Sequence, residues 1–155
     1  MSIFLGGTGT ANELDDYEEG TFTPQMHDNN GSNTNLINTV CLYTKVGRMV
    51  NISGQITLND TGKSGTLVLT HLPFNCNSVD QLAAGSWWMD RGFGNDTVGG
   101  VCYKQANNAV IRFVNPTAVH TTNSGNDKFR SSTRYLEFSQ WQNGKHIYFN
   151  LTYNT

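Results

Sequence analysis

The clearest feature of the sequence is an alternation of apolar and polar positions with a period of two. It is strongest over residues 147–153 and recurs over residues 50–58. Successive side chains of a β-strand point to opposite faces, so this period predicts strands that bury one face and expose the other. The polar positions in both segments are mostly Asn, Ser, Thr and Gln. We therefore expect sheets with an apolar inner face and a neutral, hydrogen-bonding outer face.

Shorter segments of the same character alternate with turn-forming residues along the rest of the chain. Residues 59–65 are predicted to form a hairpin loop, and residues 106–108 a second one. A helical turn is predicted over residues 77–83, and a long loop over residues 27–39. Further strands are predicted over residues 41–46, 66–72, 84–90, 98–105, 109–114 and 135–141. Many short strands joined by turns predict an all-β fold, a jelly-roll-like antiparallel β-sandwich.

Composition limits the classes of function. Only 14% of the residues are charged and the net charge is -2, against about 25% charged residues in soluble domains. Lys and Arg are scattered rather than clustered, so we predict no nucleic-acid partner. The sequence shows no signal peptide and no apolar run that could cross a bilayer, so we predict no membrane insertion. The three cysteines have no metal or redox spacing, which fits assembly in a reducing compartment.

A search for catalytic and metal-binding motifs finds none that is complete. The segment Gly62–Ser64 resembles the end of a phosphate-binding loop, but Thr57 stands where that loop needs a glycine. The turn at Asp28–Gly31 lacks the glycine and glutamate of a calcium loop, and the four histidines have no metal-ligand spacing. We therefore predict no metal, no cofactor and no enzymatic activity. One alternative stays open, in which Asp90 and Glu137 face each other as the carboxylate pair of a glycoside hydrolase.

Two adjacent tryptophans on a predicted strand are candidates for ligand binding. Neighbouring strand residues point to opposite faces, so one of Trp87 and Trp88 is expected in the core and the other on the surface. An exposed indole offers a flat apolar area and one N–H donor, which suits the face of a sugar ring; the alternative is that both are structural. The polar loop 121–128 is a second candidate, because rigid sandwiches present recognition loops. The candidate ligand-binding residues are Trp87, Trp88, Asp90, Asn95 and Asp96, and around the loop His120, Asn123, Asn126, Tyr135 and Trp141.

The N-terminal residues differ in character from the rest of the chain. Residues 3–5 form a small apolar plug, and residues 13–19 hold five acidic residues and no basic one. We interpret residues 1–20 as a connector or docking arm and residues 21–155 as a single β-sandwich domain. Such an arm is expected to dock on a basic surface with an apolar pocket. The candidate docking residues are Ile3, Phe4, Leu5, Asp15, Asp16, Tyr17, Glu18 and Glu19.

This region also carries a family resemblance. Residues 14–24, LDDYEEGTFTP, resemble the segment that joins the shaft to the C-terminal receptor-binding domain in many tail-fibre and tail-tip proteins of tailed bacteriophages. The preceding GGTGTANE, the hairpin sequence YTKVGRMV at residues 43–50 and LPF at residues 72–74 fit the same family in order. The resemblance covers residues 6–75 and does not extend further.

The resemblance implies a homotrimeric tip of a phage tail that binds a glycan or protein of the bacterial surface. It also implies that other tail or virion proteins hold the arm, and that the protein is assembled in the host cytoplasm and functions in the virion. Family members are usually long chains, so this chain is expected to be either a truncated fibre or a short protein docked through its arm. Two other functions stay open: a structural adaptor or decoration protein without a receptor, and a fragment of a polysaccharide depolymerase.

Overall fold

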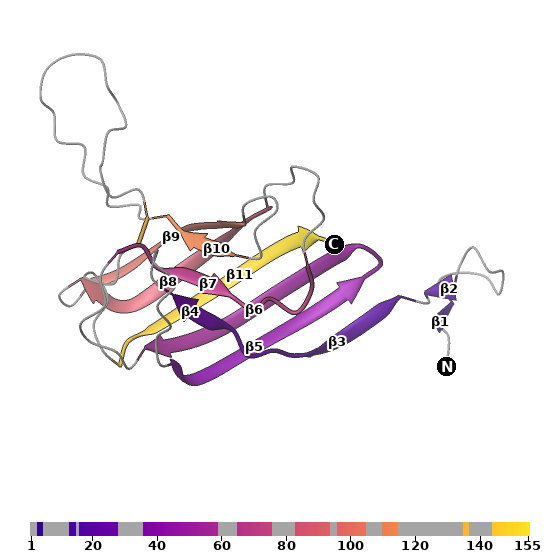
Figure 1. The fold of residues 1–155 in the computed structure, drawn as a ribbon, viewed down its shortest axis with the longest axis horizontal. Helices are drawn as coiled ribbons and strands as arrows, with labels where there is room; N and C mark the ends of the chain where they lie inside the picture. Colours follow the sequence, from indigo (N-terminus) through magenta and orange to yellow (C-terminus); the bar gives the residue numbers. More distant parts are fainter. Residues whose placement is uncertain are drawn as a thin grey trace, which may run out of the picture.

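The computed structural model shows an all-β chain built from antiparallel strands (Figure 1). It describes residues 3–4, 13–14, 16–27, 36–58, 65–75, 83–93, 96–104, 110–114, 135–136 and 144–155. No helix occurs in this described part of the chain. The predicted antiparallel β-sandwich is therefore confirmed.

Nine of the strands form one hydrogen-bonded sheet, and two form a separate small sheet. The small sheet pairs β1 (Ile3–Phe4) with β2 (Glu13–Leu14). The nine-stranded sheet has the order β3-β5-β6-β11-β8-β9-β10-β7-β4. Its strands are β3 (Tyr17–Thr21), β4 (Gln25–His27), β5 (Leu36–Val46), β6 (Met49–Leu58), β7 (Val68–Thr70), β8 (Ala83–Phe93), β9 (Asp96–Lys104), β10 (Ile111–Phe113) and β11 (His146–Asn154).

The two edge strands of the nine-stranded sheet, β3 and β4, follow each other in the sequence. Only residues 22–24 separate them, and the Phe22 amide donates a hydrogen bond of 3.0 Å to the Cys41 carbonyl oxygen of β5. Because the chain passes from one edge of the sheet to the other within a few residues, the sheet must fold back over itself. Figure 1 shows the result: a layer with β4 and β7 lies over a layer with β5, β6 and β11.

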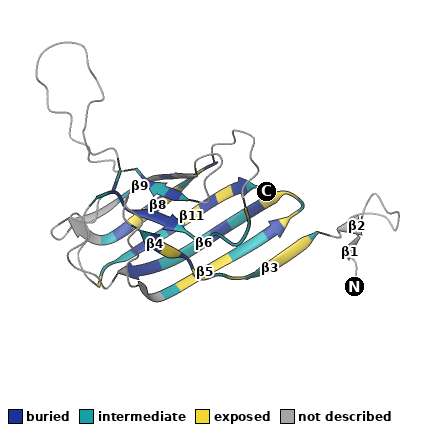
Figure 2. Cartoon of the chain, in the orientation of Figure 1, coloured by how far each residue is buried: buried dark blue, intermediate teal, exposed yellow. Residues whose placement is uncertain are grey.

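The core lies between these two layers. Alternate residues of β11 are buried, from Ile147 to Tyr153, and Figure 2 shows buried and exposed positions alternating along the large strands. Phe113 of β10 joins the layers, because its ring packs edge-on against Trp87 and Phe149, with centroids 5.9 Å and 6.4 Å away. Close packing of aromatic side chains fixes the spacing between the layers. We call the layer that contains β3, β5, β6, β11 and β8 the larger layer. Its other face, on which Trp88 and Leu42 are exposed, is open to solvent.

The predicted hairpin across residues 59–65 is wrong. β6 pairs along both of its edges, with β5 and β11, whereas β7 pairs with β10 and β4. Because both edges of β6 are occupied, the chain crosses to the other layer before β7 begins. Residues 36–39, predicted as part of a loop, form the start of β5, and the strand predicted over residues 84–90 extends to Phe93. The predicted hairpin of β9 and β10 is confirmed.

Two other predictions fall mostly outside the described residues. Ala83, the last residue of the predicted helical turn, begins β8, and residues 77–82 are not described. Of the strand predicted over residues 135–141, only the first two residues are described, and Tyr135 forms an isolated bridge with Val114.

Two buried cysteines give a test of the core. Cys41 and Cys102 are free thiols, and burial raises the pKa of each from its ordinary 9.0 to about 12. In a Cys76→Ser variant, we predict that Ellman's reagent at about pH 8 labels them about a hundredfold more slowly in the folded than in the unfolded protein. Unfolded thiols lose protons at lower pH than folded ones, so the free energy of unfolding should fall between pH 9.0 and about 12. Rapid labelling of the folded variant would contradict this burial.

Candidate ligand-binding surface

The two adjacent tryptophans have different environments. Trp87 is 3% exposed, and its indole Nε1 donates a hydrogen bond of 3.1 Å to the Val114 carbonyl oxygen. Trp88 is 46% exposed. The predicted division into one core and one surface residue is therefore confirmed. Trp87 is a correction to the candidate ligand-binding set, because its ring is enclosed by the second layer and its N–H is already used.

Trp88 is held in place on the outer face of the larger layer by an aromatic neighbour. It lies opposite Tyr148 in the β8–β11 register, and the two rings are stacked with centroids 4.3 Å apart and planes 10° from parallel. Cross-strand aromatic pairs of this kind stabilise a sheet. A side chain that is already ordered loses little entropy when a ligand covers it. The exposed indole is therefore a pre-organised apolar platform.

The neighbour of Trp88 on the other side is Gly99 of β9. A Cβ at Gly99 would lie 2.8 Å from the Trp87 carbonyl oxygen and 3.1 Å from the Trp88 Cβ. The close approach of the two strands therefore requires glycine here. Because Gly99 has no side chain, none stands at this register position on the side of the indole opposite Tyr148.

A hydrogen-bonded group completes the surface on the other side of Tyr148. His146 Nδ1 lies within hydrogen-bond distance of the Thr57 hydroxyl and 3.2 Å from the Gln55 amide nitrogen. The His146 ring is also 6.2 Å from the Tyr148 ring. Thr57 is buried, so the network is tied to the sheet. These contacts hold His146 and Gln55 in place beside the aromatic stack.

The next register row carries small polar residues. Asn150 of β11 lies opposite Ser53 of β6 and Ser86 of β8, and both Asn150 and Ser86 are exposed. Each offers both hydrogen-bond donors and acceptors. We call the set of Trp88, Tyr148, Gln55, His146, Asn150 and Ser86 the Trp88 surface.

Only part of the predicted site comes together on this surface. Asp90 is half-buried, two residues after Trp88 on the same strand. Tyr135 belongs elsewhere: it bridges Val114 and faces Arg112, whose guanidinium carbon is 5.3 Å from its ring centroid. That places it with β10, in the layer that covers the inner side of β8. Asn95, His120, Asn123, Asn126 and Trp141 lie outside the described residues, as does the side chain of Asp96.

Sequence reasoning missed Tyr148, His146 and Gln55 as members of a site. Tyr148 occupies an outward position of the strongly alternating final strand, and an aromatic residue at a polar position was the available signal. No local signal joins residue 55 to residue 148 or residue 148 to residue 88. Their proximity depends on the long-range register of β6, β11 and β8.

Residues 16–19 of the acidic run, which we call the acidic segment, lie at the edge of the same layer. Tyr17–Thr21 form β3, paired with β5, so part of the segment assigned to the arm belongs to the sheet. The ammonium group of Lys45, a buried residue of β5, contacts the Asp16 carboxylate and lies 3.0 Å from a Glu18 carboxylate oxygen. Hydrogen bonds to Asp16 and Glu18 raise the pKa of Lys45. Asp16 and Glu18, two carboxylates of the acidic run, therefore have a basic partner within this chain. Docking of the arm on another protein stays a prediction.

The remaining docking candidates are only partly described. Tyr17 is exposed, and its hydroxyl donates a hydrogen bond of 2.6 Å to Glu19, which raises the pKa of Tyr17. Ile3 and Phe4 form β1, but their side chains are not described. Leu5 and Asp15 lie outside the described residues.

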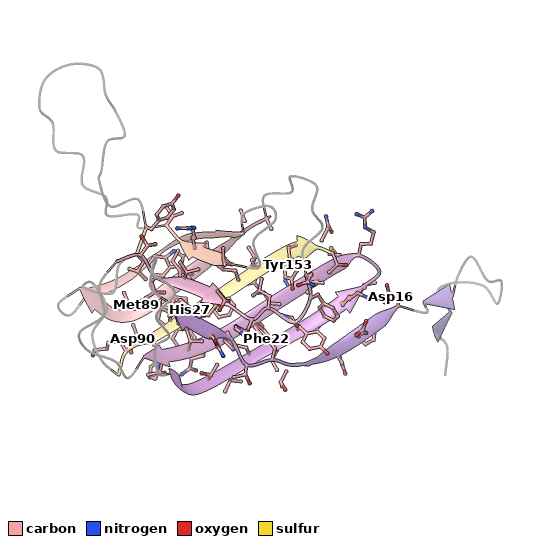
Figure 3. All side chains as sticks on the ribbon, in the orientation of Figure 1. Asp16, Phe22, His27, Met89, Asp90 and Tyr153 are labelled. Carbon is pink, nitrogen blue, oxygen red and sulfur yellow. The ribbon has the colours of Figure 1, made fainter. Side chains whose placement is uncertain are left out.

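The acidic segment and the Trp88 surface lie toward opposite ends of the larger layer. The Gly47 amide, in the β5–β6 turn, donates a hydrogen bond of 2.9 Å to the Asp16 carbonyl oxygen. Asn154 lies at this end of β11, opposite Met49. Tyr148 is six residues further along the strand, which corresponds to about 20 Å. Figure 3 shows Asp16 and Asp90 at opposite ends of the molecule.

No family model, curated protein or solved structure that was compared with the chain matches it. Within the described residues, no group of three or more His, Cys, Asp or Glu side chains is placed to hold a metal ion. The same part of the chain contains no helix long and apolar enough to span a membrane.

Proposed function

We propose that the protein is a receptor-binding tip of a bacteriophage tail fibre or tail tip, and that the Trp88 surface binds a glycan of the bacterial cell. The proposal combines the resemblance of residues 6–75 to that family with the geometry of the outer face. It makes the protein a binding component of the virion rather than an enzyme. The arm would attach it to other tail or virion proteins.

The supporting observation is the position of an exposed, rigid aromatic stack. Trp88 rests on Tyr148 at the end of the layer away from the acidic segment. A protein held at its N-terminal segment would present this end outward. Flat aromatic rings with polar neighbours suit the apolar face and the hydroxyl groups of a pyranose. Position and chemistry thus favour the same role.

An exposed apolar stripe supports self-association. The side chains of Val40, Leu42 and Val46 on the outer face of β5, and of Met49 at the start of β6, are exposed. Val40 and Leu42 form one pair and Val46 and Met49 a second, with Thr44 between them on the same face. Exposed apolar residues that lie close together commonly mark protein contacts. We propose that this stripe packs against neighbouring copies in a homotrimer. The same stripe is what favours the second candidate function, a structural adaptor or decoration protein, which would use it without binding any receptor.

Binding of fluorescently labelled protein to a panel of intact bacterial strains tests the proposal. We predict that Trp88→Ala weakens binding to a recognised strain by about tenfold or more, because a stacked aromatic contact at the centre of an interface is commonly worth 2 kcal/mol or more. Tyr148→Ala should weaken binding less, because it removes the support of Trp88 rather than the contact itself.

The matched control is Tyr17→Ala. Tyr17 is 44% exposed, close to the exposure of Trp88, but lies at the other end of the layer. It should leave binding unchanged once light scattering shows that the oligomeric state is the same. Binding by Trp88→Ala equal to that of the parent would refute the assigned site. Absence of binding to every strain would favour the adaptor.

A further inference from the structure

We infer that the Trp88 surface selects a neutral pyranose and discriminates against acidic sugars such as uronic and sialic acids. The inference rests on the proposed glycan binding and adds the charge class of the ligand. It follows from the combination of side chains that the β6, β11 and β8 register places on one face.

The apolar part of the surface fits an uncharged ring. Trp88 offers a large flat area, with Gly99 on one side and the stacked Tyr148 on the other. A pyranose covers such an area through its C–H groups, which gain from leaving water. A carboxylate on the sugar would lose water near the same apolar area. That loss is costly unless a cation compensates for it.

An acidic sugar would need a cation, and the strands that build the surface carry none at their described outward positions. The described outward positions of β6, β11 and the stretch of β8 from Ser86 to Asp90 include no Lys or Arg. They are Met49, Asn51, Ser53, Gln55 and Thr57 on β6, His146, Tyr148, Asn150, Thr152 and Asn154 on β11, and Ser86, Trp88 and Asp90 on β8. Carboxylate recognition in proteins relies on charge-assisted hydrogen bonds, above all from Arg. These positions include one acidic residue, Asp90, and no Lys or Arg that could make such a bond.

The polar part of the surface suits hydroxyl groups. Asn150 and Ser86 are exposed beside the stack, and an amide or a hydroxyl can both donate and accept a hydrogen bond. Sugar hydroxyls also do both, so either orientation of the ring finds partners. The Asn51 amide donates a hydrogen bond of 2.9 Å to the Thr152 hydroxyl. This pair extends the neutral polar face toward the end of the larger layer at which the acidic segment lies.

The test compares polymers that differ only in charge. Pullulan, galactan and mannan are immobilised beside the same polymers after oxidation of their primary hydroxyl groups to carboxylates, and equilibrium binding is measured. Dextran is not used, because its C6 is largely in linkages and cannot be oxidised in this way. We predict Trp88-dependent binding to at least one neutral polymer, and binding about tenfold weaker to its carboxylated form.

Three variants make the outcomes decisive. Trp88→Ala identifies binding through this surface. Arg91→Gln and Lys145→Gln remove the two cations that stand nearest to the surface in sequence. Neither change should alter the preference for the neutral polymer, because the inference gives these cations no part in binding, and a changed preference would contradict it. Equal or tighter Trp88-dependent binding to a carboxylated polymer would overturn the charge inference while leaving glycan binding intact. The same inference fails if no neutral polymer is bound in a Trp88-dependent way, and the whole-cell assay then decides separately whether the protein binds a receptor.

Discussion

Trp87→Ala should lower the free energy of unfolding by about 3–5 kcal/mol, whereas Trp88→Ala should lower it by about 1 kcal/mol. The two residues are adjacent and chemically identical, so the difference measures environment alone. Trp87 is enclosed between the layers, where it packs edge-on against Phe113 and donates to the Val114 carbonyl oxygen. Its removal leaves a large cavity and takes the indole N–H donor away from the part-buried Val114 carbonyl oxygen. Trp88→Ala removes a stack on the surface and leaves no cavity.

Chemical denaturation followed by circular dichroism measures both values, since the loss of a tryptophan does not interfere with that signal. Trp87→Phe serves as the matched control: it keeps most of the apolar volume and removes the N–H donor, so it should fall between the parent and Trp87→Ala. Similar losses in Trp87→Ala and Trp88→Ala would mean that the two faces of β8 are not inner and outer as described. The same pair separates function from folding, because only Trp88→Ala should reduce binding without unfolding.

The period of two predicted the main strands of the larger layer because burial is the dominant constraint on them. In β11, every second residue from Ile147 to Tyr153 faces the core, so the apolar residues of the sequence mark the inner face directly. The same reasoning divided Trp87 from Trp88. Local alternation fixes which face a residue occupies, and that part of the candidate site could be predicted.

The neighbours of Trp88 could not be predicted, because register is a property of strands distant in sequence. Gln55, Tyr148 and Trp88 form one row only through the pairing of β6 with β11 and of β11 with β8. Nothing local to any of the three residues specifies that pairing. The crossover from β6 to β7 was missed for the same reason: turn-forming residues at 59–65 are compatible with a hairpin, but β11 occupies the edge of β6 that a hairpin would need.

The acidic segment makes a contact within the chain that its sequence pattern did not indicate. Its charge indicated a basic surface, and we expected that surface on another protein. Lys45 lies in this chain, buried beneath the segment, with its ammonium 5.5 Å from the Phe74 ring centroid. In the sequence, nothing around Lys45 indicates that it contacts the acidic segment. Only the pairing of β3 with β5 places Lys45 beside Glu18.

Gly85→Ala should lower the free energy of unfolding by about 3 kcal/mol or more, the cost of overpacking against atoms that cannot move aside. Gly85 lies in β8 opposite Leu151 of β11. A Cβ at Gly85 would lie 1.9 Å from the Asn150 carbonyl oxygen and 2.8 Å from the Leu151 Cα, both backbone atoms of a central strand. Since those atoms are fixed by pairing on both sides, β8 itself must move away. Denaturation followed by circular dichroism measures the loss.

Gly144→Ala is the control that separates crowding from backbone strain. Gly144 has a φ of 78°, and a Cβ there would have no neighbour within 4 Å, so its replacement should cost only the strain of a left-handed residue, about 1 kcal/mol. Equal losses for Gly85→Ala and Gly144→Ala would contradict the close approach of β8 and β11. That approach also bears on function, because Trp88 and Tyr148 lie on the same two strands, three residues from Gly85 and Leu151. Any Gly85→Ala protein that folds should therefore hold the Trp88–Tyr148 stack less firmly and, if the proposed function is correct, bind bacterial cells more weakly than the parent.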